Sequence, residues 1–225
     1  MKERPIIFSA PMVRAILFDR KTQTRRIAKI PLDAKSAFYD DECDSHCWSM
    51  EEDGMADPHA KMLRNPYGEF RDRLWVKETF QVSPDGPIYR ATKWEHGTSD
   101  FGGDGPWKPS IFMPRWASRI TLEITHVRVE RLQDITEEDA KAEGMAFKDF
   151  GRDCFHTGSI KDVEDCKAPH STHPQRNGWS WKEVKDHTEC LSTARWAYAN
   201  LWNSINGPAS WDLNPWVWVI QFKRV

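Results

Sequence analysis

Four cationic residues and two threonines gather in the stretch DRKTQTRR, residues 19–26. They are Arg20, Lys21, Thr22, Thr24, Arg25 and Arg26. Lys21 and Thr24 stand three residues apart, so their side chains can converge on one point of a turn. A lysine amine whose pKa is lowered by neighbouring cations can accept a proton from a threonine hydroxyl and make it a nucleophile. The same group can instead bind a phosphate, and residue types alone favour that reading. A solvated loop is the simplest alternative.

Glu143 is a carboxylate that could complement the cations at 20–26, although it lies far from them in the sequence. Glu143 falls in the last turn of the helix predicted from ITEEDAKAEGM, residues 135–145. The helix dipole is negative there and disfavours a carboxylate by about a few tenths of a kcal/mol. Glu143 is therefore either an exposed residue that tolerates this cost, or a carboxyl held at a site with its proton affinity raised.

Further candidates come from the middle of the chain. Glu78 shares a predicted strand face with Leu74 and Val76, so it lies either near the cations or in a structural ion pair. The chain has 12 tryptophans, which gives it unusual capacity for aromatic packing or base stacking. The side chains that could stack on or clamp a base are Trp75, Tyr89, Arg115 and Trp116. Core packing is the ordinary role of each tryptophan.

Cysteine and histidine residues suggest a metal site only weakly. Cys43, His46 and Cys47 are spaced like half of a site, and a second group comprises Cys154, His156, Cys166, His170 and His173. Zinc usually needs four well-placed ligands, and no paired C-x-x-C is present. We therefore expect no metal and no cofactor. The 5 cysteines form no even disulfide framework, and we expect most of them to be thiols.

Length and charge limit the class of protein. A chain of 225 residues can bury a proper core as one generous domain or two small ones. The net charge of −2 gives no overall attraction to nucleic acid, so any site for a polyanion must be local. No stretch approaches the roughly 20 apolar residues of a membrane span, and the N-terminus lacks a secretory apolar region. We expect a cytoplasmic protein without membrane partners.

The pattern of the chain predicts short strands and a few helices. Helices are expected at 9–18, 135–143 and 192–207, and strands at 72–80, 88–92, 118–132 and 215–225. A slip in the alternation at Thr125 and His126 predicts a bulge, and the last strand, apolar on both faces, should be central. Two polar segments, 30–66 and 148–190, read as insertions or long loops. The order of elements fits an α+β fold, a small mixed β-barrel with flanking helices.

Several of these motifs together resemble one family. ILFDRKTQTRR, DRLWVKE, ITEEDAKAEGM and the closing WVWVIQFKRV are similar to motifs of the ASCH family, and phage-encoded members resemble the chain most. The resemblance implies a PUA-like β-barrel and one domain over residues 1–225, with insertions at 30–66 and 148–190. The family usually has glycine where this chain has Asp19, and Pro-Gly where it has Phe70 and Arg71. Aspartate tolerates a left-handed backbone better than most residues, and the turn at 70–71 is expected to be rebuilt.

The resemblance also implies a function directed at RNA or a nucleoside. One branch of the family, the small bacterial acetylcytidine amidohydrolases, removes the acetyl group from the exocyclic amine of cytidine. Its catalytic residues correspond to Lys21, Thr24 and Glu143 of this chain, with Thr24 as nucleophile, Lys21 as base and Glu143 handling the proton or the oxyanion. The partner would be a modified nucleoside or RNA, in the cytoplasm of a bacterial host. The alternatives are an RNA-binding module without catalysis, serving a phage against its host or in regulation, and a ribonuclease.

Overall fold

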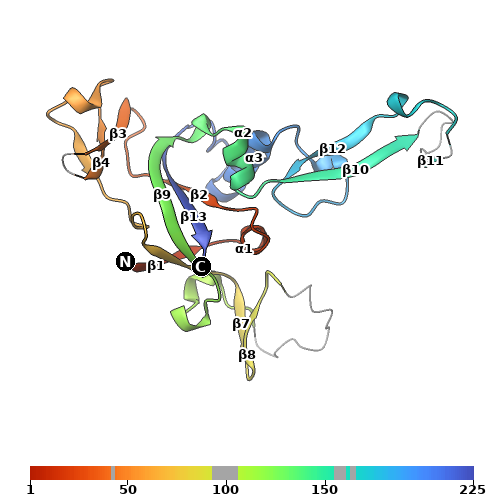
Figure 1. Cartoon of the computed structure of the whole chain (residues 1–225), viewed down its shortest axis with the longest axis horizontal. Helices are drawn as coiled ribbons and strands as arrows, with labels where there is room; N and C mark the ends of the chain where they lie inside the picture. Colours follow the sequence, from red (N-terminus) through yellow and green to blue (C-terminus); the bar gives the residue numbers. More distant parts are fainter. Residues whose placement is uncertain (42–43, 93–105, 155–160, 163–165) are drawn as a thin grey trace.

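The structure, a computed structural model, describes residues 1–41, 44–92, 106–154, 161–162 and 166–225. It is a mixed α+β fold made mostly of strands, as the sequence predicts, and its centre is a five-stranded sheet (Figure 1). The strand order is β1 (Glu3–Ile7), β6 (Arg73–Lys77), β9 (Thr121–Arg131), β13 (Trp216–Arg224) and β2 (Gln23–Ile27). β1 and β6 are parallel, and the other neighbours are antiparallel.

The closing strand β13 is buried on both faces, because it lies between β9 and β2 and helices cover one side of it. Val217 and Val219 pack into one hydrophobic cluster, while Trp218 and Ile220 pack into another on the opposite face. This confirms the central position predicted from its continuous apolar run.

The predicted irregularity in the long strand is also present. His126 pairs with Gln221, but the next pair joins Ile124 to Phe222, so Thr125 is the extra residue of a bulge in β9. Such a bulge bends the strand and increases its twist.

Three α-helices flank the sheet: α1 (Ala10–Leu17), α2 (Glu137–Ala142) and α3 (Ala194–Asn206). The Thr136 hydroxyl caps α2 by accepting from the Asp139 amide, and Thr193 caps α3 in the same way. Gly207 ends α3 with a φ of +102°. The 3-10 turns are η1 (Gly54–Ala56), η3 (Ser110–Phe112), η4 (Arg115–Ala117), η5 (Leu132–Asp134), η7 (His170–Thr172) and η8 (His187–Glu189). None of the helices in the described part of the chain is long and apolar enough to cross a membrane.

The described strands do not close into the expected barrel. β1 and β2 are the two edges of the central sheet, and no described backbone ladder joins them. The Arg26 guanidinium reaches across instead, and its Nη2 donates to the Ile7 carbonyl at 2.6 Å. A side chain therefore bridges the edges where a closed barrel would have backbone pairing.

Both polar segments form strands, so the alternative of a long loop at 30–66 is wrong, while the interpretation of both segments as insertions stays a prediction. Within 30–66 the chain builds a small antiparallel sheet of β3 (Ser36–Asp40), β4 (Ser45–Ser49) and β5 (Lys61–Leu63). Its contact with the main body was not visible in the sequence: the His46 ring packs edge-on against Trp218 at 5.0 Å. This tertiary contact buries part of the segment. The acidic composition of the segment gave little indication that it forms strands.

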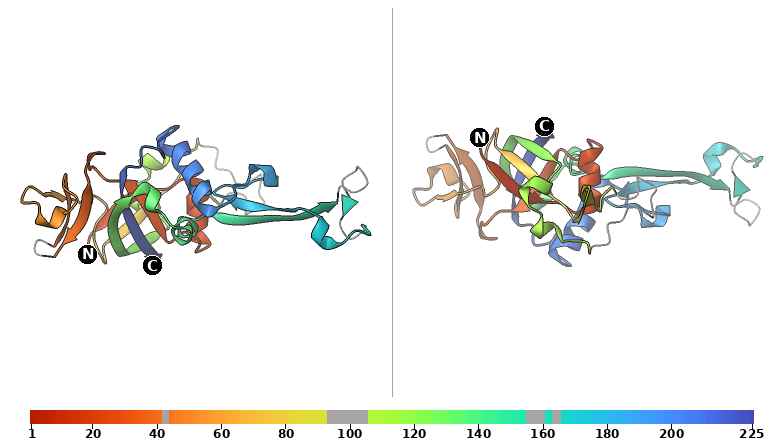
Figure 2. Two further views of the ribbon diagram at one scale, coloured as in Figure 1. Left: turned by 90° about the horizontal axis from the view of Figure 1, so that it is seen from above. Right: turned by 90° about the horizontal axis from the view of Figure 1, so that it is seen from below.

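The second polar segment forms a projecting arm. β10 (Ala146–Cys154) pairs with β12 (Gln175–Ser180) and, near its end, with β11 (Lys161–Asp162). In both views of Figure 2 this arm extends from the body on the side opposite the β3–β5 sheet. A shorter hairpin, β7 (Phe80–Ser83) with β8 (Gly86–Tyr89), leaves the body elsewhere. The strand expected at 88–92 is therefore β8, which spans Gly86–Tyr89.

Five non-glycine residues in the described part of the chain have the positive φ that glycine usually provides, and two of them lie in turns singled out from the sequence. Asp19 has φ +54° and Arg71 has φ +69°. The Arg71 amide donates to the Ile124 carbonyl at 2.9 Å, which fixes the turn that precedes β6. The turn at 70–71 thus uses a left-handed residue even though the glycine is replaced.

Candidate functional site

The turn after α1 delivers Lys21 to the interior. The amides of Arg20 and Lys21 both donate to the Ala15 carbonyl, at 2.8 and 3.0 Å, so the chain folds back over the end of α1. The left-handed Asp19 makes this reversal. As a result the Lys21 side chain is fully buried, although its neighbours Arg20 and Thr22 are exposed.

The end of α2 brings Glu143 to the same place. The Thr22 amide donates to the Ala142 carbonyl at 2.8 Å, and Lys21 and Glu143 form an isolated antiparallel bridge. Gly144 follows with φ +101°, and a Cβ there would lie 2.9 Å from the Ala15 Cβ. Only glycine therefore permits the close approach of the two segments.

Lys21 and Glu143 form a buried ion pair. The Lys21 Nζ lies 2.6 Å from the Glu143 Oε2 and also donates to the Glu143 carbonyl at 3.0 Å. The second carboxylate oxygen accepts from the Arg25 Nη1 at 3.2 Å. The ring of Phe8 lies beside the amine, 5.6 Å from Nζ to its centroid. The carboxyl of Glu143 is thus inside the protein and not at an exposed helix end.

The pair belongs to a wider network on one face of β2. The Arg25 Nη2 contacts Glu130 at 2.6 Å and Asp139 at 2.7 Å, and Arg128 contacts the same two carboxylates. Three cations, including Lys21, thereby face three carboxylates, including Glu143. Arg128, Glu130 and Asp139 were not among the residues predicted from the sequence, although Arg128 and Glu130 share a face of the long strand.

Burial shifts the proton affinities within this network. It lowers the pKa of Lys21 below the ordinary 10.5, and the carboxylate of Glu143 offsets part of that change. Burial also disfavours a charged Arg25, but Glu143, Tyr198 and Glu130 outweigh it and raise the pKa of Arg25. For Asp139, burial is overcome by its hydrogen bond from Arg25, so its pKa is lowered. Lys21 is therefore the cation of this network whose proton is held less firmly than usual.

Thr24 is buried but is not joined to the pair. It lies in β2 opposite Ile220, and the strand pleat directs its side chain away from the face on which Arg25 contacts α2. No hydrogen bond among the described residues connects Thr24 with Lys21 or Glu143. The structure thus brings together two of the three predicted catalytic residues.

A hollow of about 280 Å³ adjoins Lys21. Thr22, Phe222 and Arg224 are among the residues that line it with Lys21. The Lys21 side chain is 0% exposed, so a water-sized molecule in this hollow does not touch its amine. Arg20 lies outside this hollow, with its guanidinium 5.9 Å from the Phe18 ring.

The other predicted residues form a separate group. Glu78 is 2% exposed, and Arg119 holds both of its oxygens, at 2.9 and 3.0 Å. The Arg119 guanidinium also stacks over Tyr89 at 3.9 Å, and the Tyr89 hydroxyl donates to the Ala117 carbonyl. Glu78 is thus in an ion pair, and its partner Arg119 was missed because nothing in the sequence links residues 41 positions apart.

The remaining aromatic and basic candidates lie at the surface. Arg115 pairs with Glu3 and lies 6.0 Å from the ring of the half-buried Trp75. Trp116 is 67% exposed and available for stacking. No hydrogen bond or ion pair in the described part of the chain links Arg115 to the Lys21–Glu143 pair.

The candidate metal ligands fall into different places. Cys43 and His156 lie outside the described residues, and nothing is described of the side chain of His170. Three others, Cys154, Cys166 and His173, have ligand atoms within 4.8 Å of one another. They lie on the arm and not beside Lys21.

Comparison with known proteins gives no match: no family model, curated protein or solved structure is similar to this chain.

Proposed function

We propose that the chain is a hydrolase that removes an acyl group from the exocyclic amine of cytidine or a related modified nucleoside. The observation that carries the proposal is the buried contact between Lys21 and Glu143, in which burial lowers the pKa of the lysine beside a hollow. A general base must hold its proton weakly near the working pH, and burial is one way to achieve this.

The proposed reaction is an acyl transfer through an ester formed on Thr24. The Thr24 oxygen attacks the acyl carbon, and its proton passes to the neutral amine of Lys21. The bond from the acyl carbon to the exocyclic nitrogen then breaks, and that nitrogen takes the proton from Lys21. Water hydrolyses the threonine ester and releases the acid. Glu143, anchored by Arg25, holds Lys21 in place and shares its proton.

Thr24 must approach Lys21 for this step. Catalytic hydrogen bonds in unliganded sites are often long and tighten when the substrate is bound. Thr24 lies in β2 on the face away from the network around Arg25, so this step requires a rearrangement of the backbone between Lys21 and Thr24 when the substrate binds.

The fold supports the same proposal. Asp19 and Arg71 adopt positive φ at the two positions where the ASCH family has glycine. A non-glycine residue seldom adopts this conformation, so its presence at both positions favours the same turns. We infer a PUA-like arrangement whose edges, β1 and β2, are bridged by Arg26.

The test is acid release from N4-acetylcytidine and other acylated nucleosides by the purified chain. Lys21→Met, Thr24→Val and Glu143→Gln should each reduce kcat/KM by about 100-fold or more. Thr24→Ser keeps a hydroxyl and should retain much of the activity. Lys29→Ala, at an exposed lysine, is the matched control. No acid release by folded wild-type protein, or full activity of Thr24→Val, would contradict the proposal.

RNA binding without catalysis is the second candidate. Lys223 and Arg224 line the hollow together with one acidic residue, Asp19, so cations outnumber carboxylates in its lining. Each cation also has an acidic neighbour, since Lys223 contacts Glu123 at 2.8 Å and Arg224 contacts Asp19 at 3.5 Å. Affinity for RNA should then fall with salt by about one log-log unit for each phosphate contacted, and Arg224→Ala should reduce that slope by about one. Binding independent of salt argues against this candidate. Loss of RNA integrity in the same assay would indicate a ribonuclease.

A further inference from the structure

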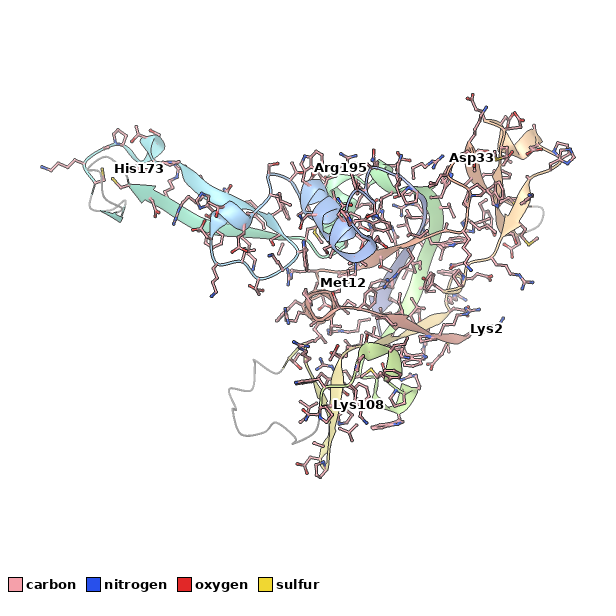
Figure 3. The ribbon with its side chains drawn as sticks, turned by 180° about the vertical axis from the view of Figure 1, so that it is seen from behind. Lys2, Met12, Asp33, Lys108, His173 and Arg195 are labelled. Carbon is pink, nitrogen blue, oxygen red and sulfur yellow. The ribbon has the colours of Figure 1, made fainter. Side chains whose placement is uncertain are left out.

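We propose that Cys154, Cys166 and His173 bind a zinc ion that stabilises the outer end of the β10–β12 arm. The two sulfurs and one ring nitrogen lie within 4.8 Å of one another. Figure 3 shows His173 at the far end of this arm, well away from Met12 on α1. The site is therefore separate from the Lys21–Glu143 pair.

The strand register itself brings two of the ligands together. Arg152 of β10 pairs with Gln175 of β12. Cys154 follows Arg152 by two residues at the end of β10, where it pairs with Lys161 of β11, and His173 precedes Gln175 by two residues, so both lie just beyond the last β10–β12 pair. The two are 19 positions apart in the sequence, so spacing along the chain gives no sign of this.

The distances suit a tetrahedral ion. Zinc binds cysteine sulfur at about 2.3 Å and histidine nitrogen at about 2.0 Å, so ligand atoms in a tetrahedron are about 3.3–3.8 Å apart. Atoms already within 4.8 Å need only small side-chain rotations to reach those positions. The fourth position of the ion is then taken by water or by one more side chain.

The described residues of the outer arm form no apolar core of their own. Among the described residues between 149 and 177, only Cys154 and His173 are buried. They are 1% and 2% exposed. None of the three hydrophobic clusters includes a residue of this range. A segment that cannot bury apolar surface is commonly stabilised by a metal ion, whose binding energy becomes folding energy.

Neighbouring groups orient the ligands. The Ala168 amide donates to the Cys166 sulfur at 3.4 Å, a contact that favours a thiolate. The Arg152 Nη1 donates to the His173 carbonyl at 2.9 Å, and its Nε donates to the Gln175 side chain. Arg152, two residues before Cys154, thus fixes the backbone around His173.

The donor set selects the metal. Two thiolates and an imidazole suit zinc, whereas magnesium and calcium require oxygen ligands. Zinc has no redox chemistry and accepts a tetrahedral site, which matches a role in holding the arm.

The first measurement is the metal content of the full chain purified under reducing conditions with zinc in the medium. We expect about one zinc ion per chain by mass spectrometry, and a thiolate-to-metal absorption band when cobalt(II) replaces it. Cys154→Ser, Cys166→Ser and His173→Ala should each weaken zinc binding by more than about 100-fold. Cys190→Ser, at a cysteine outside the cluster, is the matched control and should bind zinc as the wild type does.

The second measurement needs no variant and therefore does not depend on variants that fold. Chelation of wild-type protein should increase amide hydrogen exchange in residues 149–177 and leave β9 and β13 protected, and added zinc should reverse the change. Reduced protein that binds neither zinc nor cobalt overturns the proposal. So does a disulfide between Cys154 and Cys166, a different metal that zinc does not displace, or equal loss of zinc in Cys190→Ser.

Discussion

Replacing Glu143 by glutamine should destabilise the folded protein by about 3–4 kcal/mol, because it leaves the buried Lys21 without its carboxylate. The side chains of Lys21 and Glu143 are 0% and 2% exposed, so water cannot take over the role of the lost partner. Lys21→Met should cost about 2–3 kcal/mol, since the carboxylate of Glu143 still accepts from Arg25.

The size of this destabilisation follows from two opposing contributions, the attraction between the two charges and the cost of removing them from water. At 2.6 Å and an effective dielectric constant of about 20, the attraction between the two charges is about 6 kcal/mol. Removing both charges from water costs a comparable amount, so the intact pair adds little net stability. A single substitution removes the attraction but keeps the desolvation cost of the remaining charge. The double variant Lys21→Met with Glu143→Leu should therefore be more stable than the sum of the single effects predicts.

The assay is a double-mutant cycle in urea unfolding, followed by tryptophan fluorescence and circular dichroism. We expect a coupling energy of about 2–3 kcal/mol between Lys21 and Glu143. The matched control is the pair of Lys223 and Glu123, which is 2.8 Å apart but has side chains 61% and 23% exposed. Its coupling should be below about 1 kcal/mol.

The reasoning is refuted if Glu143→Gln changes the free energy of unfolding by less than about 1 kcal/mol while the control cycle behaves as expected. That outcome would place Glu143 in water, at an ordinary helix end. It would also remove the buried contact between Lys21 and Glu143, which is the observation that carries the proposed function.

Three further predictions concern the same parts of the molecule. Gly144→Ala should destabilise the folded protein by more than about 2 kcal/mol, because its Cβ would lie 3.2 Å from the Lys21 Cβ in a left-handed backbone. The control Gly151→Ala has φ +73° but nothing within 4 Å of the added Cβ, so it should cost only about 1 kcal/mol in the same urea assay. The stability of wild type relative to Lys21→Met should increase as the pH rises toward 10.5, because the folded state loses the Lys21 proton at a lower pH than the unfolded state does; a flat difference between about pH 7 and pH 10 would contradict this. Glu78→Gln should cost about 3 kcal/mol, as it leaves Arg119 without a carboxylate, and urea unfolding with an unchanged m-value would check it.

The helix ends and the strand bulge could be predicted from the sequence alone. Thr136, Thr193 and the two glycines at 144 and 207 mark helix ends by local chemistry, so α2 and α3 could be located without a structure. The bulge at Thr125 was visible because a strand has a side-chain period of two, and a slip in that period has few other causes.

Composition hid the structure of the polar segments. Apolar and polar residues do not alternate regularly in strands β3, β4 and β10, so the strand signal is weak there. They form because they pair with distant residues, such as Lys148 with Gly178, and pairing partners are not encoded in a local pattern.

The partners of charged side chains were decided only by the tertiary structure. The sequence singled out Lys21, Thr24 and Glu143, but it could not show that Lys21 and Glu143 meet across 122 positions while Thr24 lies on the other face of β2. Contact between them requires the chain reversal at Asp19, the close approach at Gly144 and the order of strands in the sheet. An ion pair depends on distance and burial, and both are properties of the assembled fold.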